Sequence, residues 1–116
     1  NAAVFPNRCE GGTNLVAMEA MACGVPCILS ANTGHLDIIT DDNCFALDHQ
    51  RPVTDPNSRT SMWRESRVEQ IVEQLETIYT DQKMARQRGE AGAAFIGNLS
   101  WQNQTAALVG AVSDLL

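Results

Sequence analysis

Basic residues are scarce in this sequence of 116 residues. It has 8 Lys and Arg against 14 Asp and Glu, which gives a formal net charge of −6 at pH 7. Nucleic acids and anionic membranes bind proteins through basic surfaces, so this balance argues against both as main partners. A local cationic site remains compatible with a small anionic ligand.

Long apolar runs are also missing. No run approaches the roughly 18 residues that a membrane-spanning helix needs. The first residues have neither the charged start nor the apolar stretch of a signal peptide. We therefore expect a soluble, cytoplasmic protein.

Cysteine and histidine are too few for a disulfide scaffold and too scattered for a metal site. The four cysteines include no Cys-x-x-Cys pair, and neither His35 nor His49 stands at zinc-ligand spacing from such a pair. We expect four reduced thiols that behave as small apolar residues, with zinc or redox chemistry as the minor alternative. There is no Asp-x-Asp triplet, and the adjacent Asp41 and Asp42 indicate a solvated turn.

What remains is the composition of one globular domain, with 44% hydrophobic and 19% charged residues. The chain divides into three segments. Residues 1–48 alternate short apolar runs with one helical stretch, residues 49–63 are polar and hold two prolines, and residues 64–116 are helical by period. We predict a β/α part, a loop and a helical tail.

The first segment predicts a strand–helix–strand unit. A strand ends at Phe5, a helix covers residues 15–23, and the apolar run 25–30 is typical of a parallel strand covered on both faces. Thr13 or Asn14 is placed to cap the helix and Gly24 to end it. Residues 44–47 are a third strand candidate. The fold class is α/β, with a short parallel sheet and flanking helices.

The tail predicts three helices. Asp81 is placed to cap the second and Ser100 to cap the third. The first carries an apolar stripe at helical spacing: Val68, Ile71, Val72, Leu75, Ile78 and Tyr79. The third carries a line that we expect to be buried: Trp101, Thr105, Leu108, Val112 and Leu115.

The stretch from Glu10 to Glu19 holds the candidate chemistry. Gly11 and Gly12 allow a sharp turn and a close approach of the backbone to a ligand, and the helix that follows offers unpaired amides, which suit a phosphate. Glu19 lies one turn into a helix that is apolar on every side, so we expect this helix to be buried and the carboxylate to face a polar ligand. Phosphate and carboxylate together describe a nucleotide. The alternative is a plain tight turn, with Glu19 paired to an arginine.

The segment FPNRCEGGTNLVAMEAMACGVPCILS strongly resembles the donor-binding signature of the GT-B glycosyltransferases, in particular the large retaining family 4. Residues 33–39 resemble the glycine loop of that family and the short helix after it, 43–47 its next strand, and 65–116 its closing helices. The resemblance implies part of a Rossmann-like GT-B C-terminal domain, spanning residues 1–116.

The resemblance also implies roles for individual residues. Glu19 matches the second glutamate of the family's paired motif, whose carboxylate binds the nucleotide ribose. The amides of Thr13, Asn14 and Leu15 match the stretch that holds the diphosphate, after the turn at Gly11 and Gly12.

The first motif glutamate departs from the family's spacing. The family usually has seven residues between its two glutamates, whereas eight separate Glu10 from Glu19, so the expected position falls on Gly11. We expect the glycine turn to absorb one residue and Glu10 to keep the catalytic role beside the donor sugar.

The implied function is donor binding in a glycosyltransferase that moves a sugar, with retention, from a nucleotide-diphosphate sugar to an acceptor. The family holds the diphosphate with helix termini and basic side chains, so we expect no metal or other cofactor. The chain resembles the family only from about the fourth strand of the second domain. We therefore expect a truncated fragment that is inactive alone and self-associates through an exposed strand edge or an uncovered apolar face of the sheet. The alternatives are an isolated nucleotide-binding or interaction module and a GT-B nucleotide-sugar epimerase.

Overall fold

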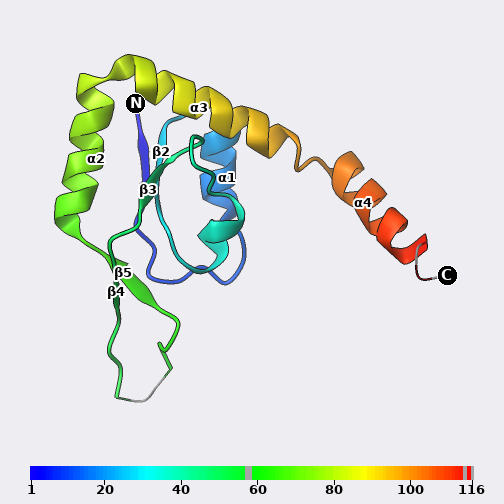
Figure 1. The fold of residues 1–116 in the computed structure, drawn as a ribbon, viewed down its shortest axis with the longest axis horizontal. Coiled ribbons are helices and arrows are strands. Elements are labelled where there is room, and N and C mark those ends of the chain that lie inside the picture. The colour runs from blue at the N-terminus through cyan, green and yellow to red at the C-terminus, as the bar shows by residue number, and fades with distance from the viewer. Residues whose placement is uncertain (57–58, 114, 116) are drawn as a thin grey trace.

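A computed structural model describes residues 1–56, 59–113 and 115 of the chain (Figure 1). Its central feature is a three-stranded parallel sheet in the order β1-β2-β3. The elements of this part are β1 (Ala3–Phe5), α1 (Leu15–Ala22), β2 (Cys27–Ser30), the 3₁₀ helix η1 (Thr33–Asp37) and β3 (Phe45–Leu47). The predicted strand–helix–strand unit and the third strand are confirmed, and the architecture is consistent with a Rossmann-like α/β domain.

Helices cover both faces of the sheet at its central strand β2 (Figure 1). Cys27 and Leu29 of β2 pack with α1 and the end of α3 on one face. Ile28 packs with Phe45 of β3 and with α2 and the start of α3 on the other face. All four residues of β2 are buried, which explains its unbroken apolar sequence.

Helix α1 begins and ends where its sequence indicates. The Asn14 side chain accepts a hydrogen bond from the Ala17 amide at 3.1 Å and so caps the helix. Gly24 follows the helix at φ 70°, a backbone conformation that glycine adopts without strain. Gly89 of α3 packs directly on this turn, because a Cβ there would lie 2.3 Å from the Gly24 carbonyl oxygen.

The segment predicted as a loop, residues 49–63, contains a strand. β4 (Gln50–Pro52) pairs antiparallel with β5 (Arg64–Ser66), so the tail also begins with a strand and not with a helix. These strands are short and polar, and their pairing is fixed by contacts across the hairpin that leave no apolar period in the sequence. Pro52 is compatible with a two-stranded ribbon, since both of its strands are edges.

The three helices of the tail are confirmed. They are α2 (Val68–Thr80), α3 (Gln82–Gly97) and α4 (Trp101–Ser113). Asp81 caps α3 through a hydrogen bond from the Met84 amide at 2.8 Å, and the Ser100 hydroxyl accepts from the Asn103 amide at 3.3 Å. No helix within the described ranges is long and apolar enough to cross a membrane.

The predicted buried line on the last helix is wrong. α4 has no buried residue and projects away from the body of the molecule (Figure 1). Trp101 is 86% exposed, and the other residues of that line, Thr105, Leu108, Val112 and Leu115, are exposed as well. An apolar stripe indicates that a helix has a face to cover, but it does not say which surface covers it. Among the described residues, no element packs along this face.

The stripe on α2 is only partly a core surface. Ile78 is buried against β3, and Ile71 is half-buried beside it. The other members of the stripe are exposed: Val68, Val72, Leu75 and Tyr79. The sheet is narrow, so α2 contacts it along one line of side chains and leaves the neighbouring line free.

Candidate functional site

The glycine turn rests on the loop after β2. The Gly34 amide donates to the Glu10 carbonyl oxygen at 3.2 Å, and the Glu10 amide donates to the Thr33 hydroxyl at 2.7 Å. A Cβ at Gly34 would lie 1.4 Å from the Gly12 carbonyl oxygen. Only glycine fits this position, so Gly34 allows the turn at Gly11 and Gly12 to pack against the loop at the carboxyl end of the sheet.

Gly11 and Gly12 themselves face open space. Both are exposed, a Cβ at either would meet nothing within 4 Å, and neither has a positive φ. The left-handed positions of this region are Asn14, at φ 54°, and Thr33, at φ 40°. The expected left-handed conformation at the glycines is absent: in this segment Asn14 adopts it, and Thr33 adopts it in the neighbouring loop, while the two glycines leave their backbone uncovered.

Unpaired amides follow the turn. Asn14 satisfies the amide of Ala17, whereas the amides of residues 13–16 meet no acceptor among the described residues. These donors lie at the positive end of α1 and at the carboxyl end of a parallel sheet, where ligands of open α/β folds bind. The arrangement can bind an anion.

The expectation that Glu19 sits in a buried helix is wrong. Only Ala17 and Met21 of α1 are buried, and Glu19 is exposed on the same side as Leu15, one turn earlier, which is 72% exposed. The sheet and α3 cover a single face of α1, so its outer apolar residues remain in contact with solvent. The Glu19 carboxylate makes no ion pair within the described residues, which argues against the alternative of a partner arginine.

Glu10 is half-buried and held from its own loop. Its Oε2 accepts a hydrogen bond from Asn7 Nδ2 at 3.0 Å. The Asn7 carbonyl oxygen accepts in turn from Ser30 Oγ at 2.8 Å and from Asn32 Nδ2 at 2.9 Å. The carboxylate of Glu10 is thereby fixed relative to the end of β2, on the same turn as the open glycines.

His35 is a residue of this site whose role the sequence leaves undefined. Its side chain is fully buried, with Nδ1 3.0 Å from the Ser30 carbonyl oxygen and Nε2 2.8 Å from Asn14 Nδ2. Its place directly after the loop glycine is a weak signal, because a histidine in a loop is more often structural or solvated than it is part of a site.

A shallow cavity of about 590 Å³ opens beside the turn, between the loop after β2 and the β4–β5 hairpin. Its lining includes Thr33, Leu36, Asp48, Met62 and Arg64. Apolar side chains, one carboxylate and one guanidinium thus face the same space, next to the loop that carries the glycine turn.

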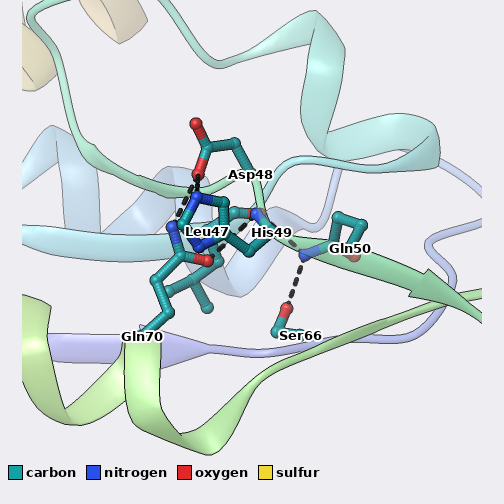
Figure 2. A network of polar contacts seen from close by, with 6 residues as sticks. All are labelled: Leu47, Asp48, His49, Gln50, Ser66 and Gln70. Carbon is teal, nitrogen blue, oxygen red and sulfur yellow. Dashed lines mark hydrogen bonds and ion pairs between the residues drawn. The ribbon is translucent and has the colours of Figure 1, made fainter.

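A network of polar contacts holds Asp48 and Gln50, two residues of the cavity lining, in place (Figure 2). Gln50 Nε2 donates to the Leu47 carbonyl oxygen at 2.6 Å and to Ser66 Oγ at 2.7 Å, which joins β3 to the hairpin. Gln70 Nε2 donates to Asp48 Oδ1 at 2.6 Å, and this bond is the main reason that the pKa of Asp48 lies below its ordinary value. Asp48 is therefore an anion over the whole neutral range.

Basic side chains near the turn are already engaged. Arg8, two residues before Glu10, forms an ion pair with Glu65 of the hairpin, and Arg51 Nη2 lies 3.8 Å from the same carboxylate.

All four cysteines are free thiols. Among the described residues, there is no group of three or more His, Cys, Asp or Glu side chains that could hold a metal ion.

Comparison with known protein families gives a match over most of the chain. Residues 1–108 match a protein-family model described as family 4 glycosyltransferase in conflict systems. No curated protein matches significantly. The family match covers the sheet, the glycine turn, the hairpin and most of the helical tail. The chain therefore belongs to the family 4 glycosyltransferases of conflict systems.

Proposed function

We propose that this chain binds the donor of a glycosyltransferase reaction, a nucleotide-diphosphate sugar whose sugar passes with retention to an acceptor. The proposal rests on one juxtaposition above all. Unpaired amides at residues 13–16 lie beside the bare Gly11–Gly12 backbone, and the unpaired carboxylate of Glu19 stands one helical turn further on. Such amides suit a diphosphate, and a carboxylate suits the two hydroxyls of a ribose.

In this proposal each residue has a separate task. The amides of Thr13, Asn14 and Leu15 hold the diphosphate, Glu19 holds the ribose, and Glu10 faces the donor sugar. Family membership supports these assignments, and the open surface over the turn is compatible with them. The donor itself is the only small molecule required, without a metal ion.

Donor binding alone does not make this chain a catalyst. A departing nucleotide diphosphate needs positive charge beside it, and the guanidinium of Arg8, two residues before Glu10, is paired with Glu65. We therefore propose that sugar transfer needs an acceptor-binding region and further basic residues that the described residues do not provide.

Two other functions are the alternatives. A nucleotide-sugar epimerase would convert its donor with no acceptor present, whereas a transferase would not. An isolated nucleotide-binding or interaction module would instead bind a partner through its helical tail, where the apolar residues of α4 are exposed.

The test is a titration with UDP, GDP and ADP, followed by the amide signals of residues 13–15. We expect saturable binding of at least one of them, and we expect Glu19→Gln to weaken it about tenfold, or ~1.4 kcal/mol, because the neutral amide is a poorer acceptor for ribose hydroxyls.

The matched control is Glu73→Gln, which removes one exposed carboxylate from α2, away from the turn. It removes the same charge, so its dissociation constant should stay within twofold of the wild type. Equal losses in both variants would indicate a general charge effect and would count against a ribose contact at Glu19.

A further inference from the structure

His35 connects the end of β2 to the start of α1. The ring is fully buried, and both of its nitrogens have polar partners. Nδ1 lies 3.0 Å from the Ser30 carbonyl oxygen and 3.1 Å from Ser30 Oγ, while Nε2 lies 2.8 Å from Asn14 Nδ2. No other side chain links these two elements at the mouth of the sheet in the described part of the chain.

The hydrogen bonds determine which ring nitrogen carries the proton. Asn14 Oδ1 accepts from the Ala17 amide, so the Asn14 Nδ2 group is the one that points at His35. An amide nitrogen only donates, so Nε2 of His35 accepts, and the ring proton resides on Nδ1. The Nδ1–H group donates to the Ser30 carbonyl oxygen, and the Ser30 hydroxyl donates to the Asn7 carbonyl oxygen.

This tautomer orients the cap of α1. If the Asn14 amide turned over, its oxygen would face the acceptor nitrogen of His35, and its NH₂ group would face the Ala17 amide. Both contacts would then be repulsive. Asn14 also holds the left-handed conformation, at φ 54°, that sends the chain into the helix. His35 and the Ala17 amide therefore favour the same orientation of the Asn14 side chain, the one in which it caps the helix.

We propose that His35 is a positioning residue for the donor site: as an acceptor in its Nδ1–H form, it fixes Asn14 and so preorganises the anion-binding start of α1. The inference rests on the proposed function for what binds there, but the link between His35 and Asn14 stands on its own geometry. Its consequence for binding follows because an unfixed first turn must be ordered before it can receive a diphosphate.

Two substitutions distinguish the hydrogen bond of His35 Nδ1 from that of His35 Nε2. In His35→Gln the side-chain amide reaches about as far as Nε2 and offers an oxygen to Asn14. In His35→Asn it reaches only about as far as Nδ1, so it keeps the bond to Ser30 and loses the acceptor for Asn14. Asn is one methylene smaller than Gln and leaves the larger cavity at this buried site. Packing alone would therefore also favour His35→Gln, and the ring tautomer described below separates packing from the hydrogen bond to Asn14.

The readouts are hydrogen exchange at the Ala17 amide and the affinity for UDP, GDP and ADP. For His35→Gln we expect the exchange rate of the Ala17 amide and the dissociation constant for nucleotide to stay within about threefold of the wild type. For His35→Asn we expect each of them to rise about tenfold. Similar exchange rates and similar dissociation constants in the two variants would overturn the inference, whether they match the wild type or are both raised.

Asn14→Asp gives a measurement that does not depend on the folding of the His35 variants. It keeps an acceptor for the Ala17 amide and removes the donor to His35. The ¹⁵N shifts of the ring should show Nδ1–H in the wild type and a proton on Nε2 in Asn14→Asp. A wild-type ring protonated on Nε2 would overturn the inference. If no nucleotide binds the wild type, the proposed function fails, while the tautomer and the Ala17 exchange still decide the role of His35.

Discussion

At the scale of single residues, Gly34 is the position where one added methyl group has the largest predicted effect. Its missing Cβ is what lets the Gly12 carbonyl oxygen approach, and that oxygen belongs to the backbone, so it cannot move aside by a change of rotamer. We predict that Gly34→Ala destabilises the fold by about 3 kcal/mol, the upper end of the range for overpacking. Thermal or urea unfolding measures the loss.

The matched variant is Gly11→Ala. A Cβ there meets nothing within 4 Å, and the residue has no positive φ, so we expect a stability within about 0.5 kcal/mol of the wild type. Its methyl group would still occupy the open surface over the turn and should weaken nucleotide binding. Equal stability of the two variants would mean that the loop after β2 does not support the turn as described.

Two buried thiols give the fold a dependence on alkaline pH. Burial raises the pKa of Cys44 to about 12, an effect that the nearby Arg88 partly offsets, and it raises the pKa of Cys27 to about 11, from an ordinary value of 9.0. The folded chain therefore holds these protons when the unfolded chain has lost them. The free energy of unfolding should be insensitive to these thiols below pH 9 and should fall above it, by up to about 1.4 kcal/mol per pH unit for each thiol.

Urea unfolding between pH 8 and pH 10.5 measures this slope. Cys44→Ala removes one of the two groups and should make the decline shallower, although its stability is lower at every pH because of the cavity. Cys23→Ala is the control, since Cys23 is exposed and should leave the slope unchanged. A slope that is the same in all three proteins would contradict the assignment.

At the scale of elements, β1 is the part of the sheet that is open to a neighbour. It pairs with β2 on one side and with no described strand on the other, and Val4 is 36% exposed on its uncovered face. Edge strands with apolar residues associate. We predict that the chain self-associates at tens of micromolar and that Val4→Lys shifts it toward monomer, as measured by sedimentation velocity.

Leu108→Lys on α4 is the comparison for that experiment. It adds the same charge to another exposed apolar surface, so it distinguishes association through the strand edge from association through the last helix. A strictly monomeric wild type would contradict the prediction. Dispersal by Leu108→Lys alone would place the contact on α4.

Element by element, the sequence predicts best where the cause is local. The Asn14 cap and the Gly24 stop follow from the chemistry of one residue each, and the apolar run of β2 follows from burial on both faces. The hairpin escapes prediction because β4 and β5 are defined by their pairing. The exposure of α4 could not be predicted for a related reason. An apolar stripe indicates that a helix can pack against another surface, but it does not identify that surface.

The same distinction applies to the site in the molecule as a whole. The order of glycine turn, helix start and Glu19 is visible along the chain. The buried bridge from Ser30 through His35 to Asn14 arises only when two loops meet at the carboxyl end of the sheet. Gly34 belongs to this second group, because the Gly12 carbonyl oxygen that excludes a side chain there comes from a different loop.

The proposed binding of a nucleotide diphosphate at the start of α1 is tested by the amide spectrum of the wild-type chain, titrated with UDP, GDP and ADP. We predict saturable shifts at residues 13–15, with one base preferred, and much smaller shifts on α4. A flat response to all three nucleotides at millimolar concentration, or shifts confined to other surfaces, would contradict the account.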